Sequence, residues 1–306
     1  MIRALALMLM LSPASAGDIA FVTSQNAGVV SRVDLGSGAI LSQTAIPGDP
    51  AAVAVTPDGG AFVVSASNAT LHRLDAKGAE VGQVVLGGGP FGLAMNPARG
   101  VVYVADWYAT RVWEIDADTL TIRREFAVGK SPSGIAVSPD GTWLAVADRD
   151  SDQVSLIDAE TGAVRAVPVG ARPFGVTIHD GRVFAANVGS DSVSVIDPVA
   201  GAVIGTVPVG ERPYAVAFAA GRGFVTNQYA GSLTVFDAAS LAVIDTIEVG
   251  EYPEGIDADS AGRVIVANWM SNQLIAVNAT SLAIEGDWEM PDGPRAFGDF
   301  IRPAAP

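Results

Sequence analysis

Residues 171–210 read ARPFGVTIHDGRVFAANVGSDSVSVIDPVAGAVIGTVPVG, and this stretch decides the fold. It holds four short runs rich in β-branched residues, separated by Gly, Asp and Asn, which is the pattern of antiparallel strands joined by turns. The runs cover residues 174–178, 183–187, 192–196 and 203–209. We therefore expect four short strands in this stretch and no helix.

The same pattern recurs along the chain with a period of about forty residues. A proline follows a Gly-containing turn once per period, at Pro50, Pro90, Pro132, Pro173, Pro213, Pro253 and Pro294. An Asx residue follows a hydrophobic residue at the same spacing, at Asp34, Asp75, Asp116, Asp158, Asp197, Asp237 and Asn278. A repeated unit of four short antiparallel strands is a propeller blade. The sequence thus predicts an all-β, seven-bladed β-propeller of four-stranded antiparallel blades.

The ends of the chain predict how the ring closes. The segment that starts at Ile19 supplies three strands and lacks the first strand of a blade, whereas residues 294–301 supply only a first strand. Because a single blade cannot bury both of its apolar faces alone, we expect the C-terminal strand to join the N-terminal blade. The propeller would then be one domain over residues 17–306.

The N-terminus and the composition predict the compartment. Arg3, the apolar residues 4–11 and the triplet Ala14-Ser15-Ala16 form the pattern of a signal peptide cleaved after Ala16. We therefore expect a periplasmic or secreted protein, monomeric and without a membrane span. The absence of cysteine excludes disulfides, thiol catalysis, Cys-ligated zinc and iron–sulfur clusters. A net charge of −15 with only two lysines argues against nucleic acid as a partner.

The ends of the second strands carry a family resemblance. Residues 103–106 read YVAD, residues 224–227 FVTN and residues 265–268 IVAN. These motifs resemble the YVTN-repeat β-propeller family over the whole mature chain. The resemblance implies the propeller fold and an association with quinoprotein (PQQ-dependent) catabolism. Ser24 and Asn278 depart from the family pattern in the end repeats.

One polar residue closes each second strand: Ser24, Ser65, Asp106, Asp148, Asn187, Asn227 and Asn268. We expect these side chains, and the Asx series that begins at Asp34, to initiate turns by accepting backbone N–H bonds two residues on. His72 and His179 occupy non-equivalent positions, so a histidine-rich metal centre is not expected.

The positions that vary within this constant frame are the candidate binding residues. The ends of the second strands and the starts of the first strands share one rim of a propeller, and aromatic residues and arginines there are typical of binding hot spots. The candidate rim residues are Phe91, Trp107, Tyr108, Arg149, Arg172, Phe174, Arg212, Tyr214, Gln228, Tyr229, Glu254, Trp269 and Arg295.

Three interpretations of function stay open. The first is an exported binding or scaffold protein whose rim at the central channel takes a small anionic or aromatic ligand or a protein partner. The second, from the resemblance alone, is an accessory or subunit-like partner of a periplasmic quinoprotein dehydrogenase or electron-transfer system. The third is a calcium-dependent, lactonase-type hydrolase. Its weak candidate metal ligands are Glu254, Asn187, Asn227 and Asn268. We predict no catalytic residue and, calcium aside, no cofactor.

Overall fold

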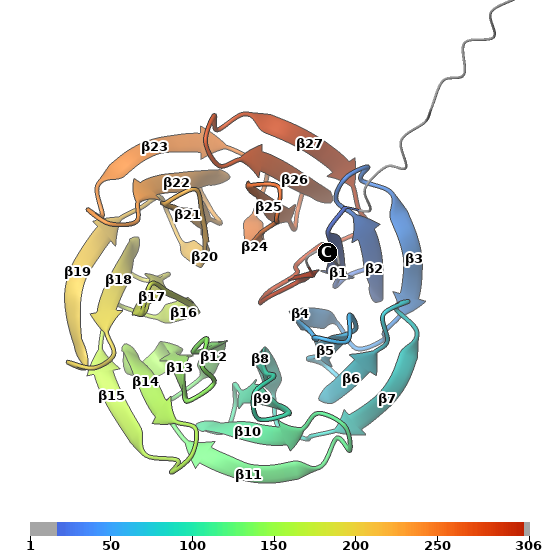
Figure 1. Cartoon of the computed structure of the whole chain (residues 1–306), viewed down its shortest axis with the longest axis vertical. Helices are drawn as coiled ribbons and strands as arrows, with labels where there is room; N and C mark the ends of the chain where they lie inside the picture. The colour runs from blue at the N-terminus through green and yellow to red at the C-terminus, as the bar shows by residue number, and fades with distance from the viewer. Residues whose placement is uncertain (1–16, 303–306) are drawn as a thin grey trace, which may run out of the picture.

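Seven four-stranded antiparallel sheets stand in a ring around a central axis (Figure 1). This computed structural model describes residues 17–302, so the predicted signal peptide lies outside the described residues. The predicted seven-bladed propeller is confirmed. We name the blades A to G in chain order, and in each blade the innermost strand faces the axis. Within the described residues no helix is long and apolar enough to cross a membrane.

The strands follow one another outward in every blade. Blade A consists of β28 (Ile301–Arg302), β1 (Ile19–Ser24), β2 (Val29–Asp34) and β3 (Ile40–Ala45). Blade B consists of β4 (Pro50–Val55), β5 (Ala61–Ser65), β6 (Thr70–Leu74) and β7 (Glu80–Val85). Blade C consists of β8 (Pro90–Asn96), β9 (Val101–Asp106), β10 (Arg111–Asp116) and β11 (Ile122–Ala127). Blade D consists of β12 (Pro132–Val137), β13 (Trp143–Asp148), β14 (Gln153–Asp158) and β15 (Val164–Pro168), with the 3₁₀ turn η1 (Arg149–Ser151) after β13.

The remaining blades repeat the arrangement. Blade E consists of β16 (Pro173–His179), β17 (Arg182–Asn187), β18 (Ser192–Asp197) and β19 (Ala202–Pro208). Blade F consists of β20 (Pro213–Ala219), β21 (Arg222–Asn227), β22 (Ser232–Asp237) and β23 (Val243–Glu248). Blade G consists of β24 (Pro253–Ala258), β25 (Arg263–Asn268), β26 (Gln273–Asn278) and β27 (Ile284–Glu289).

The C-terminal segment closes the ring, as the sequence predicted. Strand β28 pairs with β1, and the N–H of Phe21 donates to the carbonyl of Phe300 at 2.9 Å. The regular strand is shorter than the predicted 294–301. Ala296 and Gly298 have φ angles of 43° and 113°, which interrupt the extended backbone. Closure therefore depends on side-chain packing as well as on strand pairing.

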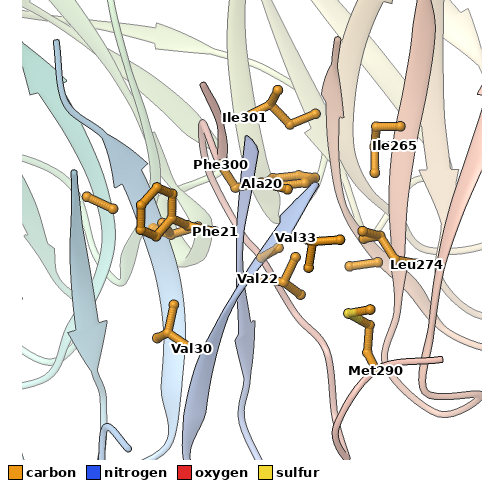
Figure 2. Close-up of a cluster of buried hydrophobic side chains, with 14 of the residues drawn as sticks. Ala20, Phe21, Val22, Val30, Val33, Ile265, Leu274, Met290, Phe300 and Ile301 are labelled. Carbon is orange, nitrogen blue, oxygen red and sulfur yellow. The ribbon is translucent and has the colours of Figure 1, made fainter. Parts of the chain in front are cut away.

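That packing is a buried apolar cluster at the junction of the chain ends (Figure 2). Phe300 and Ile301 from the closing segment lie with Phe21 of β1 and with Leu274 of β26 in the next blade. Phe21, Phe300 and Leu274 are fully buried. Because no disulfide is present, burial of these groups, at about 1.5–3 kcal/mol for each large side chain, holds the first and last blades together.

The inner strands approach one another closely near the axis. A Cβ atom on Gly92 of β8 would lie 1.8 Å from the carbonyl oxygen of Ser133 in the next blade, and one on Gly175 would lie 2.3 Å from that of Tyr214. Only glycine permits this approach of two backbones. In blades C and E the second residue after the inner-strand proline is therefore glycine.

The turns after the third strands confirm that the Asx series beginning at Asp34 initiates turns. All seven Asx side chains from Asp34 to Asn278 accept backbone N–H bonds from residues two to four positions on. This series is structural, and it leaves the opposite rim as the place to look for a binding site.

Candidate functional site

A repeated backbone hydrogen bond builds one rim of the propeller. In every blade, the residue after the second strand donates its N–H to the carbonyl of the residue before the inner-strand proline, at 2.7–3.3 Å. The pairs are Gln25–Gly293, Ala66–Asp49, Trp107–Gly89, Arg149–Ser131, Val188–Arg172, Gln228–Arg212 and Trp269–Tyr252. The two sets of loops therefore share one face, as predicted. Because only backbone atoms take part, the side chains at these positions are free to vary.

The first residue after each inner-strand proline lies at a bulge beside the axis. In blades B to G the register of the inner strand shifts directly after its proline. Such a bulge re-aims a side chain. The seven residues that follow the prolines are Ala51, Phe91, Ser133, Phe174, Tyr214, Glu254 and Arg295. A constant backbone thus presents a ring of unlike side chains.

Four aromatic rings from this region close the channel. Phe174 packs against Tyr214 with ring centroids 4.3 Å apart, and Phe91 lies 5.5 Å from Phe174. Phe297 lies 5.3–5.7 Å from all three rings. A cavity lies on each side of this aromatic floor. Phe91, Phe174 and Tyr214 line the one at the rim, and Phe297 lines the other.

The rim cavity has a volume of about 270 Å³. Its lining residues are Phe91, Trp107, Arg149, Phe174, Val188, Arg212, Tyr214, Gln228 and Arg295. All of these except Val188 belong to the candidate residues from the sequence. Three guanidinium groups and no carboxylate line the cavity, so its walls favour an anion.

The three arginines differ in their partners. The Nε atom of Arg295 lies 2.7 Å from Oε2 of the buried Glu254, and its Nη2 atom donates to the hydroxyl oxygen of Tyr214 at 2.6 Å. Arg149 pairs with the exposed Asp150 at 2.7 Å. Within residues 17–302, no carboxylate lies within ion-pair distance of Arg212, whose Nη1 atom donates to the hydroxyl of Tyr229 at 2.9 Å. Arg212 is thus the cation of the cavity that has no ion-pair partner among the described residues.

Buried groups around Arg295 have shifted pKa values. Burial raises the pKa of Glu254, and Arg295 and Gln228 partly offset that rise. Burial also raises the pKa of Tyr214 well above its usual range, so this residue is a neutral phenol at physiological pH. The network fixes Arg295 and leaves Arg212 available to a ligand.

Several predicted rim residues lie outside the cavity. Tyr108 is 81% exposed, and the side chain of Arg172 is exposed as well. Tyr229 and Trp269 lie on the rim beside the cavity and do not line it. Glu254 is buried next to the cavity as the partner of Arg295.

The polar residues that close the second strands are fully buried within the blades. The side-chain amide of Asn187 donates to the hydroxyls of Ser192 and Ser194, and Asn268 donates to the carbonyl of Val249. Of the seven, Asp106 alone accepts a bond from the N–H two residues on, at Tyr108, among the hydrogen bonds of the described residues. At Asp148, Asn187 and Asn227 bonds to side chains of the same blade replace the expected turn contact, and at Asn268 a bond to the Val249 carbonyl does so, because burial leaves a polar group no water to pair with. The buried hydroxyls of Ser24 and Ser65 have no hydrogen-bond partner among the described residues.

The candidate calcium ligands each bond to other groups in the described residues. In the described part of the chain, no contact joins the Glu254 side chain to Asn187, Asn227 or Asn268, and no cluster of three or more His, Asp or Glu side chains is arranged for a metal ion. Arg295 already occupies the Glu254 carboxylate. Calcium binding stays a prediction of the sequence.

The sequence profile of the YNCE-like β-propeller family matches residues 11–182. The chain belongs to this family. No curated protein matches the chain in sequence. Membership fixes the propeller architecture, and it assigns no ligand to the rim cavity.

Three solved structures resemble this YNCE-like propeller in fold. A protein of unknown function from Desulfotomaculum acetoxidans has a TM-score of 0.79 and 16% identity, covering 94% of this chain and 98% of that chain. Hydrazine synthase from Kuenenia stuttgartiensis has a TM-score of 0.74 and 19% identity, covering 83% and 90%. A streptogramin B lyase has a TM-score of 0.71 and 18% identity, covering 83% and 92%. At these identities the likeness concerns the fold.

A second cavity, of about 260 Å³, lies beyond the aromatic floor. The sequence did not predict this cavity. Asp257 and Asp299 line it, together with His179, whose ring stacks on Phe218 at 4.0 Å. The Oδ2 atom of Asp257 accepts the N–H groups of Phe300 and Ile301 at 3.0 and 2.9 Å. Burial, together with the neighbouring Asp299, raises the pKa of Asp257. Asp257 therefore anchors the closing segment. The sequence feature that pointed to such a role is an acidic residue within an inner strand.

Proposed function

We propose that this YNCE-like propeller is a binding protein whose rim cavity takes a small monoanion with a planar ring. The observation that carries the proposal is the combination, in one preformed cavity, of the Arg212 guanidinium, which has no ion-pair partner among the described residues, with a floor of aromatic rings. Ligand sites of this kind combine apolar walls with a few converging polar groups.

Arg212 supplies the attraction for the anion. A guanidinium matches a carboxylate with two parallel N–H bonds, and hydrogen bonds to charged groups contribute about 1.5–3 kcal/mol each. The net charge of −15 does not cancel this local attraction. At physiological ionic strength charges are screened beyond about 8 Å, so the groups that line the cavity dominate.

The aromatic floor supports a planar group. Phe91, Phe174 and Tyr214 present ring faces and edges that pack against a flat ligand ring, each contact contributing about 0.5–1.5 kcal/mol. The cavity volume of about 270 Å³ is at the lower end of the range for ligand pockets, so it accommodates one ring and its carboxylate. The Tyr214 hydroxyl accepts a bond from Arg295, and its own proton remains available to a ligand oxygen.

A calorimetric titration with benzoate tests the proposal, with benzamide as the neutral control of the same shape. We expect the carboxylate to bind and the amide to bind at least tenfold more weakly. Arg212→Ala should weaken the binding of benzoate by about ten- to a hundredfold, corresponding to the 1.5–3 kcal/mol of a charged hydrogen bond.

Arg172→Ala is the matched control, because Arg172 occupies the same position in blade E and does not line the cavity. It should leave the affinity unchanged, and both variants should melt like the parent protein. Equal affinity for acid and amide, or equal effects of the two arginine variants, would refute the proposed site.

A further inference from the structure

Three aromatic side chains form a track on the rim beside the cavity: Tyr229, Tyr252 and Trp269. Tyr229 and Trp269 come from the loops after β21 and β25, and Tyr252 comes from the crossing into β24. The ring centroids of Tyr229 and Tyr252 are 5.5 Å apart, and those of Tyr252 and Trp269 are 6.2 Å apart. Tyr229 is 50% exposed and Tyr252 36% exposed, so both rings present surface to solvent.

Arg212 joins this track to the cavity. Its guanidinium lies 4.6 Å from the centre of the Tyr229 ring, and the same group lines the cavity wall. A ligand whose carboxylate binds Arg212 therefore has the first ring of the track directly beside it. The cavity and the track meet at Arg212, which has no ion-pair partner among the described residues.

Tyr252 is held in an unfavourable backbone conformation. Its φ angle is 54°, in the left-handed region, and the next residue is Pro253, which further restricts that conformation. The equivalent positions of blades A, B and D hold the smaller residues Gly293, Asp49 and Ser131 with the same sign of φ. The repeat imposes this conformation at the equivalent positions, and in blade G it places the Tyr252 ring between the other two rings of the track.

The charges near the track determine which part of a ligand can bind there. The backbone carbonyls of Glu211 and Glu251 accept the N–H groups of Tyr229 and Met270, and both glutamates are exposed on the rim. A second anionic group on the ligand would be repelled there. The rings are tilted by 59° and 57° to one another, an arrangement that packs edge to face against an aryl ring.

We propose that the ligand is an elongated aryl monoanion, with its carboxylate and first ring in the cavity and a second, neutral aryl ring on the track of Tyr229, Tyr252 and Trp269. The inference rests on the proposed function, because it places the anionic end on Arg212. It adds a second subsite and limits the ligand to one charge.

The test compares the affinities of benzoate and 4-(benzyloxy)benzoate by calorimetry. We expect the two-ring acid to bind the parent protein at least tenfold more tightly than benzoate. Tyr252→Ala should remove most of this gain and leave the benzoate affinity within twofold of the parent value. Tyr108→Ala is the control, since Tyr108 is an exposed rim tyrosine outside the track, and it should leave both affinities unchanged.

The outcomes separate the two proposals. If benzoate binds in an Arg212-dependent manner and the second ring adds nothing, the track is refuted and the cavity stands. A gain that persists in Tyr252→Ala would reflect general apolar contact and would also refute the track. If neither acid binds, the proposed function fails and the track fails with it.

Discussion

Asp106 and Asp148 occupy the same position in blades C and D, and replacing each with asparagine should have opposite effects. Both side chains are fully buried. Asp106 lies 2.9 Å from the Nε atom of Arg111 and also accepts two backbone N–H bonds, from Gly89 and Tyr108. Asp148 has no cationic partner in the described part of the chain; its hydrogen bonds come from the neutral groups of Ser155, at 2.6 Å, and Gln153, with a backbone contribution from Gly129.

The sequence already contains the replacement in blade E. Asn187 is the equivalent residue there, and its amide donates to Ser194, which corresponds to Ser155. In Asp148→Asn the same bond can form once the serine hydroxyl turns to accept. We therefore expect this variant to keep its contact while losing a buried charge, with a gain on the order of 1 kcal/mol at pH 8.

The sign of the pH dependence follows from the pKa of Asp148. Burial raises this pKa in the folded state, while the hydrogen bonds from Ser155 and Gln153 partly oppose the rise. A raised folded pKa stabilises the protein fully below the unfolded value of about 3.9, and this contribution is lost as the pH rises through the folded value. The advantage of Asp148→Asn should therefore be greatest at pH 8 and disappear near pH 4.

Asp106→Asn should instead destabilise the protein by about 1–3 kcal/mol, because it removes the charge that pairs with Arg111. Urea unfolding followed by tryptophan fluorescence, at pH 4, 6 and 8, measures both variants. Loss of stability in Asp148→Asn at pH 8, or a gain that is the same at all three pH values, would refute the reasoning.

Three further changes test the closure and the axis of the ring. Phe300→Ala should cost about 3–5 kcal/mol in urea unfolding because the ring is fully buried in the closing cluster, whereas Ile284→Ala on the outer edge should be close to neutral. Gly92→Ala should lower the stability by at least about 1–3 kcal/mol, since its Cβ would collide with the Ser133 carbonyl; a folded protein of parent stability would show that the inner strands can separate. Raising the pH above neutral should loosen the C-terminal segment, because the raised pKa of Asp257 makes its contribution full at low pH and lost as it ionises beside Asp299. Proteolysis of this segment at pH 6 and 9 checks this, and Asp257→Asn should reduce the pH dependence, with burial of Asp299, whose pKa is also raised, supplying the remainder.

The repeat made the architecture predictable. Its period gives the number of blades, and the missing first strand at Ile19 gives the closure, because an open blade would expose apolar surface. The Asx turns were predictable for a local reason, since each side chain bonds to the backbone of its own turn. The shared rim was predictable because strand direction alternates within a blade.

The pairing of side chains across blades was not predictable. Glu254 and Arg295 meet because blades G and A are neighbours at the axis, and the bulge after each proline sets which way a side chain turns. Nothing in the sequence distinguished Arg172, which is exposed, from Arg212, which lines the cavity, although both precede a proline with positive φ. Asp257 was missed because its partners, the N–H groups of Phe300 and Ile301, belong to the far end of the chain.

The position of the site follows from where the rim departs from its own repeat. In blades E, F and G the residues before the proline are Arg172, Arg212 and Tyr252, bulky side chains at a position where the left-handed backbone favours small ones. The backbone hydrogen bonds of the rim form in every blade, so the repeat itself imposes the left-handed conformation at Arg172, Arg212 and Tyr252. The conformational energy that this costs is then a property of the repeat. Only the side chain can then be altered without disturbing the fold. The binding surface built this way joins a cavity lined from blades C to F to a track of aromatic rings over blades F and G. Arg295 of the closing segment completes the cavity, so the integrity of the ring becomes a condition for binding.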